Sequence, residues 1–213
     1  MYKFSVSGRA FEQPVLGEIS LCFKQGETVC LLGPSGCGKT SLLNILAGLD
    51  KGYQDAAWQG AKPTVGYLFQ QPRLLPWRTV LDNLLLVNPD KPRALVLLDA
   101  VGLADAANRF PAQLSLGMAR RVALVRCLLL SPDVILMDEP LVSLDPAMTG
   151  QLRTLITRLV IEDPTKHLLY VTHDLDDAVQ LGDRVMMLGG SPARITRTFK
   201  RDELSRTVLE KAY

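Results

Sequence analysis

Short apolar runs bounded by turn-forming residues predict the strands of this chain. Several of these runs are apolar at almost every position, which is typical of a parallel sheet covered on both faces. The segments expected to form strands are 3–7, 18–23, 28–32, 64–69, 133–137, 167–172, 184–188 and 193–199. The turn-rich stretch 48–62 has little periodicity and is expected to be a connection.

Helical periodicity separates these strands. Thr79 is placed to cap one helix, and Pro92 is placed at the first turn of another. The expected helices cover 41–47, about 79–87, 92–100, 115–130, about 146–161, a short segment from 174, and 201–213. Strands that alternate with helices predict an α/β fold whose sheet is fed by crossover connections.

The composition changes at Pro72, from which the pattern stays helical and is interrupted by prolines as far as residue 130. We therefore predict a single domain over 1–213. Its core would comprise 1–71 and 131–213, and a helical subdomain at about 72–130 would be inserted between two strands of that core.

Composition limits the possible functions. Apolar residues make up 47% and charged residues 22% of the 213 residues, which is ordinary for a soluble globular protein, and the net charge of +2 gives no electrostatic case for binding nucleic acid. The four cysteines lack metal-ligand spacing and suit a reducing cytosol. The N-terminus lacks the apolar stretch of a signal peptide, and no run approaches the roughly 20 residues of a membrane span. Any work at a membrane would depend on a partner.

A glycine-rich turn supplies the strongest chemical signal. It follows an apolar run and precedes an apolar-periodic one, which is the strand–loop–helix context of a phosphate-binding loop. Its residues are Gly33, Pro34, Ser35, Gly36, Cys37, Gly38, Lys39, Thr40 and Ser41. Backbone amides at a helix N-terminus bind phosphate oxygens, Lys39 would reach the terminal phosphates, and the Thr40 hydroxyl would bind Mg²⁺. A chance match in an ordinary turn is the alternative.

Asp138 and Glu139 end a buried apolar strand. Carboxylates there are costly unless a cation accompanies them, and Mg²⁺ bound beside the phosphate loop would be that cation. One carboxylate would hold the metal through a water, while its neighbour would face the attacking water. The alternative is an acidic residue that caps the next turn.

Together these segments resemble the nucleotide-binding subunits of ATP-binding cassette (ABC) transporters over nearly the whole chain. The phosphate loop is similar to the Walker A motif, Val134 to Glu139 to Walker B, and Ser143-Leu144-Asp145 to the D-loop. The remaining matches are Gln70 to the Q-loop glutamine, Leu114-Ser115-Leu116-Gly117-Met118 to the LSGGQ signature, and His173 to the switch histidine. The resemblance implies the ABC ATPase fold: a P-loop NTPase core with a mixed, largely parallel sheet, an N-terminal antiparallel β portion and an inserted helical lobe.

The resemblance also implies the roles of these residues in binding and hydrolysing ATP with Mg²⁺. Glu139 would be the general base, His173 would contact the γ-phosphate, and Gln70 would contact the metal or the attacking water and sense a membrane partner. Mg²⁺ would be held by Thr40, Gln70 and, through a water, Asp138. Phe11 is the candidate for stacking on adenine, with Tyr2 as its competitor and an ordinary core role for Phe11 left open.

In this family two subunits bind two ATP molecules head to tail, so a homodimer is implied. Ser115, Leu116, Gly117 and Met118 would act on the ATP bound by the other subunit, and Asp145 would contact that subunit. Leu116 replaces the first glycine of LSGGQ, and its bulk and resistance to positive φ are expected to matter. Met118 replaces the glutamine. Normal hydrolysis with a slightly altered interface is one hypothesis, and weak hydrolysis limited by dimer closure is its rival.

The segments 72–77, 180–185 and 191–195 are similar to importer ATPases for nitrate, sulfonates and taurine. The implied partners are an integral membrane permease and, indirectly, a periplasmic or extracellular solute-binding protein, at the cytoplasmic face of the inner membrane. The alternatives are a soluble ABC-type ATPase of a cytosolic assembly or repair complex, and a weakly hydrolysing subunit that interacts in a nucleotide-dependent way.

Overall fold

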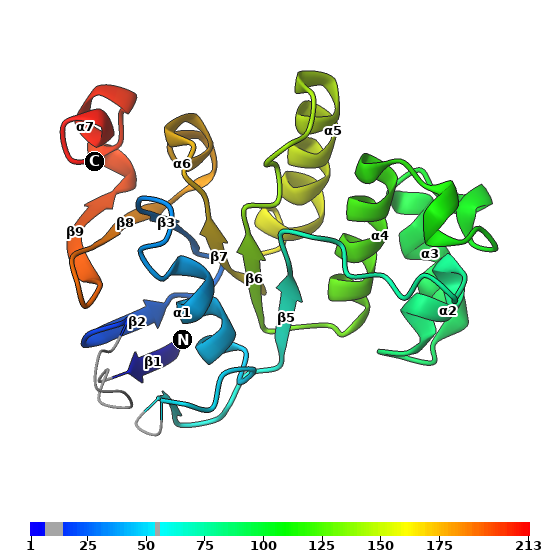
Figure 1. Ribbon diagram of the computed structural model, residues 1–213, viewed down its shortest axis with the longest axis horizontal. Helices are drawn as coiled ribbons and strands as arrows, with labels where there is room; N and C mark the ends of the chain where they lie inside the picture. The colour runs from blue at the N-terminus through cyan, green and yellow to red at the C-terminus, as the bar shows by residue number, and fades with distance from the viewer. Residues whose placement is uncertain (7–14, 54–55) are drawn as a thin grey trace.

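Two β-sheets organise the chain (Figure 1), and the computed structural model describes them over residues 1–6, 15–53 and 56–213. The larger sheet has six strands in the order β5-β6-β7-β3-β8-β9. Its members are β5 (Val65–Leu68), β6 (Val134–Asp138), β7 (His167–Val171), β3 (Thr28–Leu32), β8 (Arg184–Gly189) and β9 (Arg194–Lys200). Every neighbouring pair is parallel except β8 and β9. The predicted mixed, largely parallel sheet is confirmed.

The apolar runs of the parallel strands are continuous because both faces of this sheet are buried. Along β6, Val134 and Leu136 belong to one hydrophobic cluster, whereas Ile135 and Met137 belong to another on the opposite face. The first cluster includes helix α1 (Lys39–Leu46), which starts directly after the phosphate loop. Burial on both faces holds the parallel strands in place, and the candidate site lies at their C-terminal ends.

The smaller sheet forms the N-terminal antiparallel portion. Its order is β2-β1-β4, with β2 (Ile19–Phe23), β1 (Tyr2–Val6) and β4 (Ala57–Gln59). The Trp58 ring on β4 lies 5.1 Å from that of Phe4 and 5.8 Å from that of Phe23, so an aromatic cluster ties the three strands together. Strand β4 lies in the stretch predicted to be a connection, so that prediction was wrong there.

A helical lobe lies to one side of the sheets (Figure 1) and contains α2 (Val80–Leu85), α3 (Lys91–Ala100) and α4 (Leu116–Leu129). Thr79 caps α2 in a capping box with Asp82, as the sequence predicted for this helix start. One side of α4 packs into the lobe through Val122 and Val125, and the other side packs against the sheet. Helix α4 therefore joins the lobe to the core, and the predicted boundaries at residues 71 and 131 stay a prediction.

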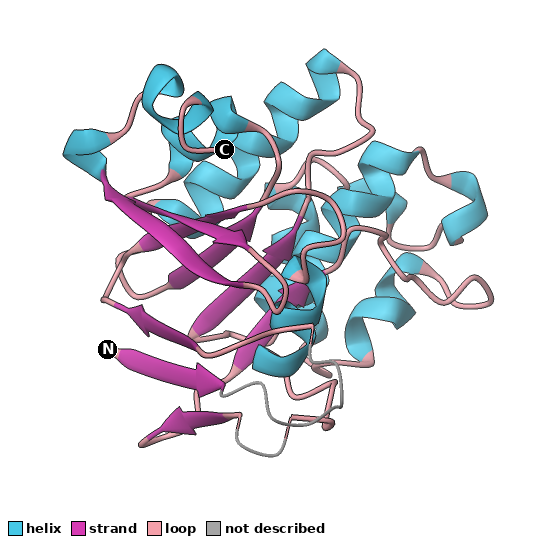
Figure 2. Ribbon diagram, turned by 60° about the vertical axis from the view of Figure 1, so that its left-hand side comes forward, coloured by secondary structure: helices cyan, strands magenta, loops and turns pink. Residues whose placement is uncertain are grey.

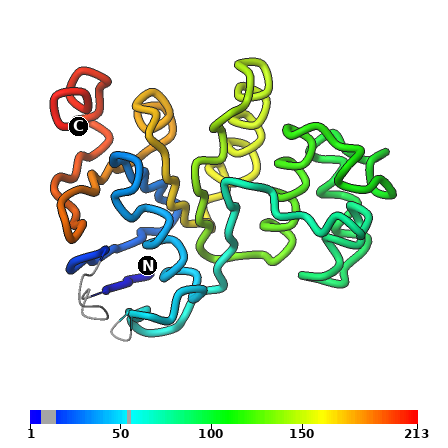
Figure 3. The backbone as a smooth tube through the Cα atoms, viewed as in Figure 1, coloured from blue at the N-terminus to red at the C-terminus, as the bar shows by residue number. Residues whose placement is uncertain are grey.

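Three helices pack on the face of the larger sheet that holds Ile135 and Met137, and Figure 2 shows helices covering this sheet. They are α5 (Pro146–Ile156), continued by a π-helical turn over Thr157–Ile161, α6 (Leu175–Leu181) and α7 (Arg206–Glu210). The C-terminal segment runs back beside α6, as the backbone tube in Figure 3 shows. The closing helix predicted over 201–213 is much shorter, because a 3-10 turn at Arg201–Glu203 precedes it and Ser205 caps a new start.

Candidate nucleotide site

The phosphate loop leaves the fully buried strand β3 and turns into α1. Gly36 and Gly38 have φ values of 79° and 101°, a region that residues with side chains rarely occupy. Gly38 occupies the N-cap of α1, and no side chain caps the helix there. A Cβ at Gly33 would lie 2.5 Å from the Leu188 carbonyl oxygen. The glycines are thus needed for the loop path, and the helix N-terminus presents amides suited to an anion.

Lys39 is buried within this loop. Its Nζ donates hydrogen bonds to the carbonyl oxygens of Gly33 and Pro34 at 2.7 and 2.9 Å, and it lies 3.9 Å from Glu139 Oε1. These contacts hold a positive charge at the mouth of the loop, where phosphate oxygens could replace the carbonyls as partners.

Thr40 and Asp138 come together although 98 residues separate them in the chain. The Thr40 hydroxyl donates a hydrogen bond of 2.8 Å to Asp138 Oδ2. Burial raises the pKa of Asp138 above its usual range, and the nearby Glu139 carboxylate raises it further, while the Thr40 hydrogen bond acts in the opposite direction. A buried carboxylate in this state is one that a cation would stabilise.

Glu139 follows directly and faces His173. The His173 Nδ1 atom lies 3.3 Å from Glu139 Oε1. Glu139 has a φ of 46°, a left-handed conformation that is strained for a residue with a side chain and is typical of functional sites. This conformation turns its carboxylate toward both Lys39 and His173.

A cavity of about 450 Å³ brings Lys39, Thr40, Asp138 and Glu139 together, whereas His173 is not among its lining residues. Nine of its ten lining residues were predicted from the sequence, and one was not. The lining residues are Val15, Ser35, Gly36, Gly38, Lys39, Thr40, Ser41, Gln70, Asp138 and Glu139. Val15 was missed, because a single valine carries no motif. Tyr67, also missed, is close enough to Asp138 for that carboxylate to add to the effect of burial in raising the pKa of Tyr67.

The remaining loop residues have structural positions. Pro34 accepts the hydrogen bond from Lys39, and Cys37 is half-buried against the sheet cluster as a free thiol. A Cβ at Gly33 would lie 2.8 Å from Cys37 Sγ, so glycine at position 33 leaves room for the Cys37 side chain.

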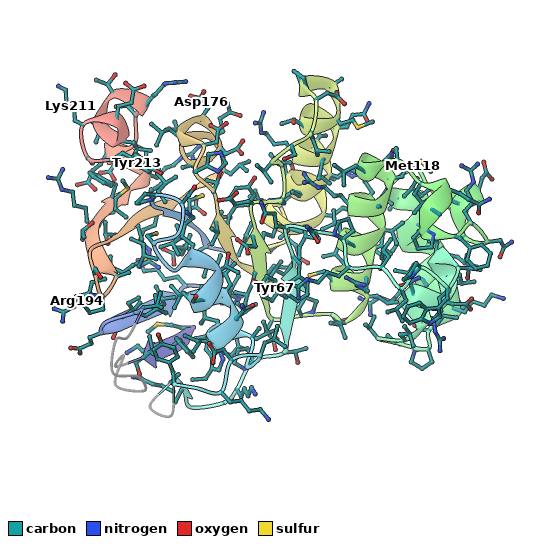
Figure 4. All side chains as sticks on the ribbon, viewed as in Figure 1. Tyr67, Met118, Asp176, Arg194, Lys211 and Tyr213 are labelled. Atoms are coloured by element: carbon teal, nitrogen blue, oxygen red, sulfur yellow. The ribbon has the colours of Figure 1, made fainter. Side chains whose placement is uncertain are left out.

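The signature segment does not line this cavity. Ser115 caps α4 and accepts a hydrogen bond from the Met118 amide at 3.2 Å, and Gly117 packs against Met148, whose Sδ would lie 2.8 Å from an added Cβ. Leu116 is the first helical residue and is 46% exposed. The expected conflict with positive φ was wrong, because the helix begins at this residue. Figure 4 shows Met118 at the lobe, away from Tyr67.

Asp145 caps α5 by accepting a hydrogen bond of 3.0 Å from the Met148 amide. Of the two adenine-stacking candidates, Phe11 lies outside the described residues. Tyr2 packs edge-on against Trp58 and His167, at centroid distances of 6.3 and 5.2 Å. His167 stands at the start of β7, whereas the phosphate loop follows the end of the parallel strand β3. Tyr2 therefore lies at the opposite end of the strands from the phosphate loop and is not suited to bind adenine.

The donor set fits Mg²⁺ bound together with a nucleotide. The Thr40 hydroxyl, the Asp138 carboxylate and the Gln70 side chain offer hard oxygen atoms around one cavity. Across residues 1–6, 15–53 and 56–213, no three His, Cys, Asp or Glu side chains are grouped to hold a metal. A small number of protein ligands is typical of Mg²⁺, because this ion usually keeps several waters and takes its remaining ligands from phosphates.

A second, more apolar cavity of about 430 Å³ lies between the core and the lobe. It is lined on one side by Leu49, Tyr67 and Phe69, and on the other by Leu86 and Arg126. The Phe69 ring stacks on Tyr67 at 3.9 Å, and the Arg73 guanidinium lies 4.1 Å from the Phe69 centroid.

In the described part of the chain, no helix is long and apolar enough to cross a membrane.

Known proteins match both the sequence and the fold. The family model described as ABC transporter matches residues 16–142. The chain is 43% identical over 194 residues to the aliphatic sulfonates import ATP-binding protein SsuB 2 of Burkholderia lata, covering 86% of this chain and 71% of the relative. It is 42% identical over 217 residues to SsuB 1 of Xanthomonas axonopodis pv. citri, covering 94% and 85%.

Among solved structures, the dimeric bacterial ABC transporter cassette MJ0796 superposes with a TM-score of 0.80 at 29% identity, over 94% of this chain and 99% of that one. The same cassette in a post-hydrolysis state bound to ADP and Pi superposes with a TM-score of 0.79. With the family model covering residues 16–142 and relatives above 40% identity along most of the sequence, this chain belongs to the ABC transporter ATP-binding family.

Proposed function

We propose that this chain is the subunit that binds and hydrolyses ATP to power an ABC importer of a small sulfonate or related oxyanion. The observation that carries this proposal is the single cavity that gathers the phosphate loop, Gln70, Asp138 and Glu139, with His173 Nδ1 3.3 Å from the Glu139 carboxylate. The choice of solute is supported by the names of the relatives, which are aliphatic sulfonate import ATP-binding proteins.

The phosphate loop, the carboxylates of the cavity and the neighbouring His173 have separate tasks in hydrolysis. The loop amides and Lys39 bind the phosphates. Thr40, Gln70 and, through a water, Asp138 would hold Mg²⁺, which would neutralise phosphate charge. Glu139 accepts a proton from the attacking water, and His173 holds the carboxylate and the γ-phosphate in register. The 3.9 Å separation of Lys39 and Glu139 places the phosphate-binding charge beside the proton acceptor.

The second half of the site comes from another copy of the chain. Ser115, Leu116, Gly117 and Met118 begin α4 outside the cavity, so in one subunit they have no access to the ATP held there. A head-to-tail dimer would bring the N-terminus of the partner's α4 to the γ-phosphate, with Asp145 at the subunit contact. Dimeric MJ0796 supports this arrangement.

The apolar cavity between core and lobe is the proposed contact for the membrane permease. Leu49 and Leu86 are exposed at 59% and 51% beside it, and its wall at Phe69 directly precedes Gln70 of the nucleotide cavity. A permease segment seated here would move Gln70 and the lobe, comprising about 72–130, together. The chain would then act at the cytoplasmic face of the inner membrane, with a solute-binding protein reached only through the permease.

The decisive experiment compares wild type with Glu139→Gln, and with Glu162→Gln on an exposed loop as control. Glu139→Gln should retain ATP binding but lower ATP hydrolysis by a factor of about 10² to 10³, and ATP should trap it as a dimer. Glu162→Gln should behave as wild type. Wild-type protein that binds ATP but does not hydrolyse it, or hydrolysis unaffected by Glu139→Gln, would contradict the proposal. Co-purification with a permease then separates a transporter subunit from a soluble assembly ATPase.

A further inference from the structure

A buried charge cluster lies outside the nucleotide cavity. Asp177 on α6 is 3% exposed. Its Oδ1 accepts hydrogen bonds from Arg153 on α5, from Nε at 3.1 Å and from Nη2 at 2.5 Å. Its Oδ2 accepts a hydrogen bond of 3.3 Å from the hydroxyl of the fully buried Tyr170 on β7. One carboxylate thus joins three successive elements of the chain, α5, β7 and α6.

Each of these elements leads to a part of the candidate site. Strand β7 ends at Val171, two residues before His173, and α6 begins two residues after it. Helix α5 begins at its cap Asp145, the residue proposed to contact the partner subunit. The cluster therefore connects the segment that carries His173 to the helix that begins at Asp145.

Hydrogen bonds carry the position of Asp177 on to His173. Asp174 Oδ1 accepts from the amides of Asp176 and Asp177 at 2.7 and 3.3 Å, and the Asp174 amide donates to Thr172 Oγ1 at 2.9 Å. His173 stands between two residues that are held in this way, and its own ring is half exposed toward Glu139.

The other end of α5 contacts the helical lobe. In the π-helical turn, Arg158 donates a hydrogen bond to the Ala100 carbonyl oxygen at the end of α3, and Leu155 and Leu159 pack against the lobe cluster. A π-helical turn inside a helix is frequent at functional sites. Helix α5 is therefore held at the lobe and, through Asp177, at the His173 segment, and it begins at Asp145, the proposed subunit contact.

We infer that Asp177, held by Arg153 and Tyr170, is a positioning residue for ATP hydrolysis that fixes the His173 segment relative to the helix starting at Asp145. The inference rests on the proposed function. Asp177 acts through His173 and does not touch the nucleotide. A small displacement of a positioned group lowers the chemical rate strongly and leaves binding by the phosphate loop unchanged.

The test uses a neighbouring ion pair as its control. Asp176, labelled on the outer side of α6 in Figure 4, pairs with Arg206, but both side chains are exposed, at 47% and 60%. Asp177→Asn and Arg153→Met should lower kcat about ten- to hundredfold, with KM for ATP and the affinity for a fluorescent ATP analogue within a factor of about two. Asp176→Asn and Arg206→Met should leave kcat unchanged.

The double variant Arg153→Met/Asp177→Asn should be no slower than Asp177→Asn, because both changes break one connection. Tyr170→Phe keeps the aromatic ring in the core, so it should fold, and it should lower kcat about threefold at unchanged KM. Rates are expressed per folded molecule, from circular dichroism. Unchanged kcat in Asp177→Asn and Tyr170→Phe, or a parallel loss of ATP affinity, would overturn the inference. Absent hydrolysis in wild type would instead refute the proposed function.

Discussion

Replacing Leu116 distinguishes normal hydrolysis from hydrolysis limited by an altered signature. Leu116 is the first residue of α4, has helical backbone and is 46% exposed. Its neighbour Ser115 caps the helix through the Met118 amide, so the cap does not depend on the side chain at 116. We therefore expect the signature to present its amides to a partner's ATP with leucine in place.

The size of the effect follows from this position. Glycine in a helix costs about 1 kcal/mol relative to alanine, and less at the first helical residue. Full burial of a leucine side chain contributes about 1.5 to 3 kcal/mol, so a half-exposed one contributes about 1 kcal/mol. Leu116→Gly should thus lower the free energy of unfolding by about 1 to 2 kcal/mol. It should change the rate of ATP hydrolysis by less than about threefold, equivalent to about 0.7 kcal/mol in the barrier.

The assay is steady-state ATP hydrolysis at saturating ATP, with urea unfolding measured on the same preparations. Leu116→Ala removes the bulk but keeps the helix propensity, and Val96→Ala removes an exposed apolar side chain from α3 as a control. A rise of about tenfold or more in Leu116→Gly would refute our reasoning. A rise in both Leu116 variants would identify the bulk as the obstacle, and a rise in glycine alone would identify backbone freedom.

Four further substitutions probe the loop, a proposed metal ligand and a buried histidine. Gly38→Ala should lower ATP affinity and stability more than Gly36→Ala, because a Cβ at 38 would lie 2.7 Å from a leucine methyl carbon while the space at 36 is open; calorimetry with ATP and thermal melts measure both. Thr40→Val should raise the Mg²⁺ concentration that gives half-maximal hydrolysis about tenfold, since the hydroxyl on Asp138 is lost. Burial lowers the pKa of His167, so the unfolded chain binds the proton more readily and stability is lost as pH falls through about 6.5 toward the folded value. His167→Phe should therefore show a smaller fall in unfolding free energy between about pH 7.5 and 5.5 than wild type; an equal fall would contradict this.

The sequence predicted most strands because burial on both faces makes them continuously apolar. Strand β4 escaped detection since it is only Ala57–Gln59, with two exposed ends. It is held by pairing with β1 and by the ring of Trp58. The closing helix was predicted too long because the cap at Ser205 lies within an otherwise helical stretch. Local pattern fails where a tertiary contact or a single cap decides the boundary.

The cavity was predictable for a different reason: its residues lie in short motifs whose chemistry demands proximity. Thr40 and Asp138 are an example, since both were expected to serve one metal ion and they share a hydrogen bond. Arg153 and Asp177 lie 24 positions apart in no motif, and only the fold, which places α5 and α6 in one hydrophobic cluster, brings them together. Sequence pattern therefore locates the groups proposed to touch ATP but not the groups that hold them in position.

The turn at Glu139 shows how the fold keeps such a group in place. Its φ of 46° is strained, and the following Pro140 restricts it further. The Glu139 amide donates to the Val171 carbonyl of β7, and the buried Arg120 of α4 donates to the Pro140 carbonyl at 2.8 Å. Strain of about 1 to 3 kcal/mol persists only where the surroundings over-determine the conformation. Because α4 also begins at the signature, a single helix braces the proposed base in its own subunit and would present the signature to the partner's ATP.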